Sequence, residues 1–327
     1  MHITVILCTY NRSASLKQAL TSAAGLVLPE SVEWEVLVVD NNSADQTRNV
    51  IEDFCTQYPG RFRYLFESKP GKSHALNAGI REASGDILAF MDDDVTLDPM
   101  WLQNLTAALP KRNWAGVGGR ILHQWNSARP HWLYVDGQYR RMAWPLTSFD
   151  LGEEACEGNK SLNGANMAFR KDVFAKHGGF RTDLGPQPGN EIRCEDTEFG
   201  LRLYAGGERV GYEPSAIVYH PVSQSRLTKV YFLAWWFDFG CATARRVSAR
   251  RVIWGLGPYL RVAKMASRLT GRMLRWMLSL ESGRRFYHKV SVWETAGVLV
   301  ESYRQLLAPN LRIRWSAESS RTADLTN

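Results

Sequence analysis

The chain has 327 residues, 45% of them hydrophobic, and a formal net charge of +7 at pH 7. This length and composition indicate a folded protein with one large or two modest domains, and they exclude an intrinsically disordered chain. The five cysteines are scattered and form no Cys-x-x-Cys pair, which argues against a zinc site or a disulfide framework and favours a reducing compartment.

Strands and helices are predicted to alternate through the first 91 residues. Buried strands are expected at residues 3–8 and 35–39 and further strands at 62–66 and 87–91, with helices between them at about 13–24, 45–57 and 73–83. Ser13 is the expected N-cap of the first helix. This order is typical of an α/β fold with a doubly wound, mainly parallel sheet. Polar residues follow each predicted strand, where such sheets bind ligands.

The acidic triplet Asp92, Asp93 and Asp94 follows the fourth predicted strand. Crowded carboxylates repel one another unless a cation lies among them. Mg²⁺ and Mn²⁺ prefer oxygen ligands, which they share with the phosphates of a substrate. Asp92 and Asp94 are two residues apart, and therefore lie on the same side of an extended chain. The triplet predicts a site for a metal and a diphosphate; a solvated acidic turn is the alternative.

The last third of the chain has a different composition. Residues 1–225 contain 22 Lys or Arg and 27 Asp or Glu, whereas residues 226–327 contain 18 and 6. The second segment also holds six of the twelve tryptophans. A domain boundary is therefore expected near residue 225, and residues 316–327 are expected to be disordered.

Helices are predicted at about 228–250, 252–280 and 286–307, each with an apolar and a basic face. Such a region favours contact with an anionic membrane surface. A nucleic-acid contact, packing on the core and an oligomer contact are the alternatives. The chain shows no recognisable signal peptide and no apolar run near the ~20 residues that span a bilayer. We therefore expect a cytoplasmic protein, peripheral on the cytoplasmic face of the membrane.

Five ordered blocks of sequence resemble glycosyltransferase family 2, the inverting transferases with the GT-A fold. The blocks are Val5 to Arg12, Asp40 to Ser43, Gly71 to Gly79, Asp92 to Asp94, and Cys194 to Asp196, and Gly164 to Arg170 is a sixth, looser match. The resemblance covers roughly residues 3–222. It implies a catalytic domain at 1–225, with a nucleotide-sugar half at 1–120 and an acceptor half at 121–225. The basic, Trp-rich helical region at 226–315 lies outside it.

The resemblance also implies roles for individual residues. The metal ligands would be Asp94 and Asp92, with His220 completing the shell, although an isolated histidine is often simply hydrogen-bonded. Asp92 would also face the ribose, and Asp93 fills the middle position of the motif. The residues expected to contact the nucleotide-sugar donor are Thr9, Tyr10, Arg12, Asp40, Lys72, Asn77, Asp92, Asp93, Gly164 and Asn166.

Two of these residues also have interpretations that do not depend on the resemblance. Asp40 could accept a hydrogen bond from the imide N–H of a base, or could simply begin a turn. Lys72 could offset phosphate charge. Gly71-Lys72-Ser73 lacks the upstream glycine of a P-loop, since Phe66 stands in that place, and a Walker-type NTPase is rejected.

Glu195 and Asp196 match the acidic pair of the family, whose Asp is the catalytic base. Transfer with inversion needs one carboxylate to take the proton of the acceptor hydroxyl, and Asp196 fits that role. Glu195 would position it or bind the acceptor. The alternative is that Asp196 caps the following helix; a helix N-terminus would also keep it ionised, so the two roles are compatible.

These features predict a metal-dependent inverting enzyme that moves one sugar from a nucleotide-diphosphate donor, UDP-linked, to a glycan or lipid-linked acceptor in surface polysaccharide synthesis. Processive relatives carry Gln-x-x-Arg-Trp, whereas Arg272 replaces the Gln before Arg275 and Trp276, which favours single addition. The rivals are a carbohydrate-binding scaffold without catalysis and a nucleic-acid-binding module that uses the basic tail. A retaining transferase is a mechanistic variant.

Overall fold

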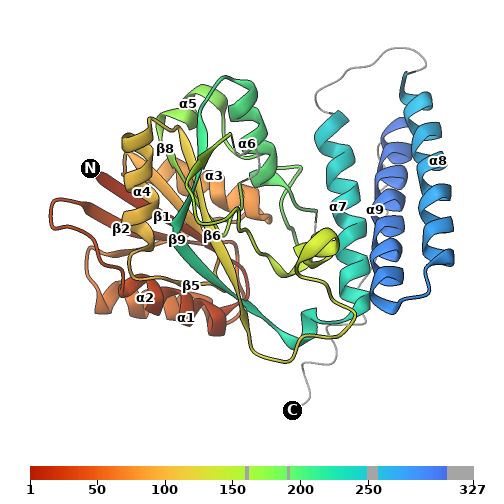
Figure 1. Cartoon of the computed structure of the whole chain (residues 1–327). Helices are drawn as coiled ribbons and strands as arrows, with labels where there is room; N and C mark the ends of the chain where they lie inside the picture. The colour runs from red at the N-terminus through yellow and green to blue at the C-terminus, as the bar shows by residue number, and fades with distance from the viewer. Residues whose placement is uncertain (159–161, 190–191, 249–256, 308–327) are drawn as a thin grey trace. The chain divides into compact units, whose positions relative to one another are not determined.

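The structure of the chain, a computed structural model, describes residues 1–158, 162–189, 192–248 and 257–307 (Figure 1). These residues fall into two compact units. Unit 1 comprises Met1–Gln124, Thr147–Gly185 and Glu195–Pro221. Unit 2 comprises the described residues of Trp125–Leu146, of Pro186–Cys194 and of the chain from Val222 onward. The domain boundary expected near residue 225 stays a prediction.

Among the described residues, the strands form one nine-stranded sheet with the order β3-β2-β1-β4-β8-β6-β9-β5, and β7 pairs with β9. The strands are β1 (His2–Thr9), β2 (Glu33–Asp40), β3 (Phe62–Phe66), β4 (Ile87–Met91), β5 (Thr96–Leu97), β6 (Gly116–Trp125), β7 (Cys156–Glu157), β8 (Asn166–Arg170) and β9 (Val210–Val222). The first four pair in parallel, while β8 runs antiparallel to β4 and β6. The predicted α/β class is confirmed, and parallel pairing joins β1, β2, β3 and β4.

Helices cover both faces of the sheet. Successive residues of a strand point to opposite faces, so one strand contacts both layers of helices. Ile3, Val5 and Leu7 of β1 pack with α1 (Ser13–Ala24), α2 (Thr47–Gln57) and α4 (Trp101–Arg112). Ile6, between them in the sequence, packs with α3 (Lys72–Glu82), α5 (Asp172–His177) and α6 (Glu195–Ala205). The apolar run of each central strand is therefore buried on both faces, as predicted for β1 and β2 and found also for β4.

The strand register brings the polar loops to one edge of the sheet. Thr9 at the end of β1 pairs with Asp40 at the end of β2, and Leu7 pairs with Met91 at the end of β4. Met91 in turn pairs with Asn166, where antiparallel β8 begins. The segments after β1, β2 and β4 and before β8 therefore lie together.

The N-terminus of α1 differs from the prediction. Arg12 occupies the N-cap position, without a capping side-chain bond, and Ser13 is the first helical residue. The Ser13 N–H donates instead to Asp45 Oδ2 at 3.1 Å, and the Asn11 N–H donates to Ser43 Oγ at 2.9 Å. The prediction of Ser13 as N-cap is wrong, because the loop after β2 supplies the acceptor and so ties the first two loops together.

Unit 2 contains α7 (Lys229–Ser248), α8 (Gly257–Leu278) and α9 (Ser282–Leu307), close to the three predicted helices. α9 packs against both α7 and α8, as Figure 1 shows. The short helices η1 (Gly137–Leu146) and η2 (Gln224–Arg226) precede them. An aromatic core includes Trp132, Phe232, Trp236 and Phe286. None of the helices in the described part of the chain has the length and apolarity needed to cross a bilayer. Residues 316–327, predicted to be disordered, lie outside the described residues.

Glycines set the close approach of α7 and α9. A Cβ at Gly240 would overlap the carbonyl oxygen of Glu294, and one at Gly297 would overlap that of Phe237. Gly271 in α8 is different, since a Cβ there would meet nothing within 4 Å.

We predict opposite effects for two Gly→Ala substitutions. Gly297→Ala forces α7 and α9 apart and lowers the free energy of unfolding by about 1–3 kcal/mol. The matched control Gly271→Ala raises it by about 0.5–1 kcal/mol, because alanine restricts the unfolded chain and fits an open helix position. Urea unfolding followed by tryptophan fluorescence measures both, and equal effects would contradict the glycine contact.

Candidate active site

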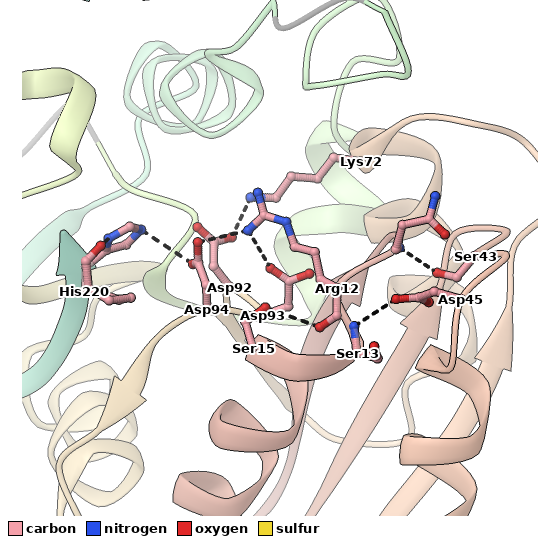
Figure 2. Close-up of polar contacts among 12 residues, drawn as sticks. Arg12, Ser13, Ser15, Ser43, Asp45, Lys72, Asp92, Asp93, Asp94 and His220 are labelled. Carbon is pink, nitrogen blue, oxygen red and sulfur yellow. Dashed lines mark hydrogen bonds and ion pairs between the residues drawn. The ribbon is translucent and has the colours of Figure 1, made fainter. Parts of the chain in front are cut away.

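The acidic triplet lies in the turn between β4 and β5, with two cations beside it (Figure 2). Arg12 Nη1 lies 3.2 Å from Asp93 Oδ1 and 2.9 Å from Asp94 Oδ2. Lys72 Nζ lies 2.5 Å from Asp92 Oδ1. Three segments that are distant in sequence thus meet at this edge, and the cations offset part of the carboxylate repulsion.

Asp92, Asp94 and His220 form a group of the kind that holds a metal ion. Each offers one ligand atom, and these atoms lie within 4.8 Å of one another. His220 Nε2 is 3.5 Å from Asp94 Oδ1, and Nδ1 is 3.1 Å from the Pro221 carbonyl oxygen. A carbonyl oxygen only accepts, so that bond needs the proton on Nδ1. In the neutral ring Nε2 then carries a lone pair beside a carboxylate, and a cation between them removes the repulsion.

The middle carboxylate, Asp93, is the most buried of the three, with 7% of its surface exposed. Burial raises the pKa of Asp93 to about 6, although the nearby Arg12 opposes the shift. Thr9, at the end of β1, is also buried, whereas Tyr10 is 42% exposed. Of these predicted donor residues, Tyr10 is therefore open to solvent and Asp93 is enclosed.

Lys72 connects the triplet to the predicted catalytic pair. It is the first residue of α3, and its Nζ lies 3.9 Å from Glu195 Oε1 as well as against Asp92. Burial alone would lower the pKa of Lys72, but Asp92 and Glu195 raise it above its ordinary value. The ammonium group therefore stays charged between two acidic groups.

Glu195 and Asp196 open α6, and backbone amides hold the second carboxylate. Asp196 Oδ2 accepts the Gly164 N–H at 2.8 Å, and Oδ1 accepts the Thr197 N–H at 2.5 Å. Burial raises the pKa of Asp196, and the Gly164 bond opposes that shift. Burial and the neighbouring Asp196 raise the pKa of Glu195 to about 7, against the pull of Lys72. α6 begins at Glu195, so Asp196 lies in its first turn and not at the cap.

Gly164 brings the backbone close to both groups. A Cβ at this position would lie 3.5 Å from Lys72 Nζ and 3.6 Å from Asp196 Oδ2. Any larger side chain would extend between the lysine and the aspartate. The contact of Gly164 with a donor sugar stays a prediction.

Other predicted donor residues are bonded within the protein. The Asn77 amide exchanges two hydrogen bonds of 2.8 Å with the Phe180 backbone. Asp40 accepts the Ser43 N–H at 2.9 Å and the Tyr64 hydroxyl at 3.3 Å, which fits the turn alternative. Asn77 thus holds the chain near Phe180, and the predicted base contact of Asp40 stays a prediction.

Asn166 is hydrogen-bonded within the core of the sheet. It is fully buried, and its amide donates to the Arg120 and Ala216 carbonyls at 2.9 and 2.8 Å. Its Oδ1 accepts the Trp101 indole N–H at 2.8 Å. With every polar atom of the side chain already bonded, contact of Asn166 with a donor finds no support in this geometry.

Asn41 is a positioning residue that the sequence analysis did not single out. Its amide donates to the Glu67 and Lys69 carbonyls at 3.0 and 2.7 Å and accepts the Gly71 N–H at 2.8 Å. These bonds fix the turn that presents Lys72. Its partners lie about thirty residues away in sequence, so no local pattern could have indicated them.

Comparison with known proteins agrees with this architecture. The chain matches the model of "Glycosyl transferase family 2" over residues 4–178, just over half of its length. The chain belongs to glycosyl transferase family 2. It is 27% identical to the succinoglycan biosynthesis protein ExoM of Rhizobium meliloti, over 72% of this chain and 70% of that protein. The predicted family is confirmed, and the protein is a glycosyltransferase.

Solved structures share the fold at low sequence identity. Mannosyltransferase PcManGT from Pyrobaculum calidifontis, in complex with GDP-Man and Mn²⁺, superposes with a TM-score of 0.59 at 18% identity, covering 94% of this chain and 88% of that one. S. aureus TarS 1-349 in complex with UDP gives 0.53 at 18% identity, covering 93% and 92%. The predicted GT-A fold is confirmed.

We predict that Asn166 contributes strongly to stability. Asn166→Ala leaves the Trp101 indole and two carbonyl groups without their bonds, and lowers the free energy of unfolding by about 3 kcal/mol or more. The control Asn104→Ala removes one exposed bond to the Ser215 carbonyl and costs less than about 1 kcal/mol. Chemical denaturation separates the two, and a small loss at Asn166 would contradict the structural role.

Proposed function

We propose that unit 1 transfers a single sugar, with inversion, from a nucleotide-diphosphate donor to an acceptor hydroxyl, and that Mn²⁺ or Mg²⁺ is required. The observation that carries this proposal is the juxtaposition of Asp92, Asp94 and His220 with Lys72 and the acidic pair at the start of α6. One part suits a cation and a diphosphate, and the other suits removal of a proton.

The residues present fit a divalent metal. Two carboxylate oxygens and one imidazole nitrogen converge, a donor set that suits Mn²⁺ and also accepts Mg²⁺. When bound, the metal would neutralise charge on the departing diphosphate. Arg12 and Lys72 contact the same carboxylates, and we assign them to the phosphates once those carboxylates bind the metal. Both cations would then keep an anionic partner.

Asp196 is our candidate for the catalytic base. Amide bonds to both of its oxygens favour the ionised carboxylate against the effect of burial and fix its direction, while lone pairs remain for an acceptor hydroxyl. Glu195 lies beside Lys72 and would set the position of that ammonium group. The proton would pass from the acceptor oxygen to Asp196 as the oxygen attacks C1 of the sugar.

The donor is proposed to carry UDP. TarS was solved with UDP, which supports this assignment, whereas PcManGT was solved with GDP-Man, so guanosine is the alternative base. Thr9, Tyr10 and Asp40 stand at the ends of β1 and β2, where we expect the nucleoside. The sugar itself is left to experiment.

The acceptor is proposed to be a glycan or a lipid-linked intermediate of surface polysaccharide synthesis in the cytoplasm. ExoM is named for succinoglycan biosynthesis, which supports a polysaccharide pathway. Single addition is supported by Arg272, which replaces the glutamine of processive relatives and is bonded to Glu294 and Thr295 of α9. All five cysteines are free thiols, which suits a reducing compartment.

A donor panel tests the proposal directly. Binding and slow hydrolysis of UDP-, GDP- and dTDP-sugars are measured by calorimetry and product release, with Mn²⁺, Mg²⁺ or a chelator present. We expect tight binding of one UDP-sugar only when the metal is present. Equal binding with the chelator would contradict metal dependence, and no binding of any donor would contradict the proposed function.

Asp94→Asn is predicted to abolish the metal-dependent part of donor binding. Mutation of a residue that hydrogen-bonds to a metal ligand typically lowers metal affinity about 10–100-fold. Loss of a ligand itself should therefore weaken Mn²⁺-dependent binding at least about 100-fold. The control Asp98→Asn removes a carboxylate four residues further along the chain, which accepts the Met100 N–H, and leaves binding intact. Calorimetric titration with Mn²⁺ distinguishes the two.

Asp196→Asn is predicted to separate binding from transfer. Losing the base lowers kcat by about 10²–10⁴-fold, while the donor Kd stays within a few-fold. Asp172→Asn, at the start of α5, is the control for a carboxylate in a first helical turn and keeps full activity. Transfer by Asp196→Asn at the parent rate, measured with the acceptor that the parent uses, would refute the assignment.

A further inference from the structure

Helix α8 has an unusual charge pattern. Its sequence contains five Lys or Arg residues and no Asp or Glu. One of the five, Arg272, is compensated, since its Nη1 lies 3.0 Å from Glu294 Oε2 of α9. The other cations have no carboxylate on their own helix to balance them.

The inner face of α8 packs against α9. The Arg272 guanidinium also donates to the Ser291 carbonyl and the Thr295 hydroxyl at 2.8 and 2.6 Å. The rings of Trp276 and Trp293 meet edge to face at 6.3 Å, with Lys289 near both. This face therefore holds α8 in place in unit 2.

The outer face of α8 is apolar and exposed. Side chains at spacings of three and four residues lie along neighbouring lines of a helix, so these residues form one stripe. The exposed fraction rises along the stripe and past the helix end: Met273 40%, Leu274 51%, Met277 57%, Leu278 79% and Leu280 95%. Five large apolar side chains so close together are more than the scattered exposure normal for a soluble surface.

A row of cations borders the stripe. Lys264, Arg268 and Arg275 are exposed and are spaced four and seven residues apart, which places them along one side of the helix. They adjoin the edge of the stripe at Leu278. Exposed Arg284 and Arg285 follow at the start of α9.

We propose that the outer face of α8 is a docking surface for an anionic lipid bilayer. The Met and Leu side chains would enter the boundary between headgroups and acyl chains, and the cationic row would contact lipid phosphates. Charge complementarity favours the bilayer over a second copy of the chain. A second copy docked through this face would bring two cationic rows into one interface, whereas an anionic lipid surface offsets the charge of the row.

Not all tryptophans of the basic region after residue 225 are exposed enough to contact a membrane. Trp236 of α7 is 2% exposed, and Trp235 stacks on Phe239 at 5.3 Å. The contact is therefore assigned to α8, at residues that the sequence composition alone did not distinguish.

The test uses the full chain without donor or metal, so its result is independent of the proposed function. Sucrose-loaded vesicles of phosphatidylcholine, with or without phosphatidylglycerol, are sedimented with the protein at low and high salt. We expect binding only to vesicles that contain phosphatidylglycerol, with a loss at high salt. Equal binding to both vesicle types, or none to either, overturns the proposal.

Variants locate the contact. Leu274→Glu with Leu278→Glu should reduce vesicle binding at least about tenfold, since two apolar side chains no longer leave water. The control double variant, Leu151→Glu with Val230→Glu, changes two comparably exposed apolar residues, 49% and 64%, outside α8. It should bind as the parent does, and equal losses in both variants would overturn the proposal.

The cationic row is tested by replacing Lys264, Arg268 and Arg275 with Gln together. This variant should lose binding at low salt while its circular dichroism matches the parent, because all three side chains are exposed. Gel filtration measures the oligomeric state of the parent and of the variants. A parent dimer that Leu274→Glu with Leu278→Glu converts to monomers, without vesicle binding by the parent, would assign the face to a second copy and overturn the proposal.

Discussion

The site depends on a balance of charge at one sheet edge. Asp92, Asp93 and Asp94 come from one turn and the acidic pair from another, and Lys72 stands between them. Carboxylates at this density would repel strongly without cations. Arg12 and Lys72 supply two positive charges, and the arrangement of Asp92, Asp94 and His220 suits a third. The same repulsion that costs stability would be relieved by a cation bound among these carboxylates.

Backbone bonds make that charge arrangement rigid. Asn41 fixes the turn before Lys72, the loop after β2 holds the start of α1 beside Arg12, and Gly164 donates to Asp196. Each bond joins segments that are distant in sequence but adjacent through the register of the sheet. The side chains of the candidate site therefore stand at helix starts, on a strand and in short loops whose positions are fixed by the sheet.

The sequence predicted the elements whose signal is local. The runs Ile3 to Cys8 and Ile87 to Met91 are apolar enough to require a strand buried on both faces. β6 was not predicted, since its glycines weaken strand propensity; in the fold Gly119 is required because a Cβ would overlap Asn166. The motif blocks located the triplet and the acidic pair. They could not show that Asn77 and Asn166 are bonded internally, because those partners are brought close only by tertiary structure.

Composition alone does not show how many of the Lys and Arg residues after residue 225 are paired with acidic residues inside unit 2. Arg245 and Arg304 both contact Glu301, and Arg272 contacts Glu294, so several cations hold the helices of unit 2 together. Because Arg245 and Arg304 share one carboxylate, these pairs cancel only part of the positive charge of the region. The exposed cations of α8 are different, because they border the apolar stripe and their own helix has no acidic residue. Net charge indicates an anionic partner, but only the side-chain contacts show which cations remain to meet it.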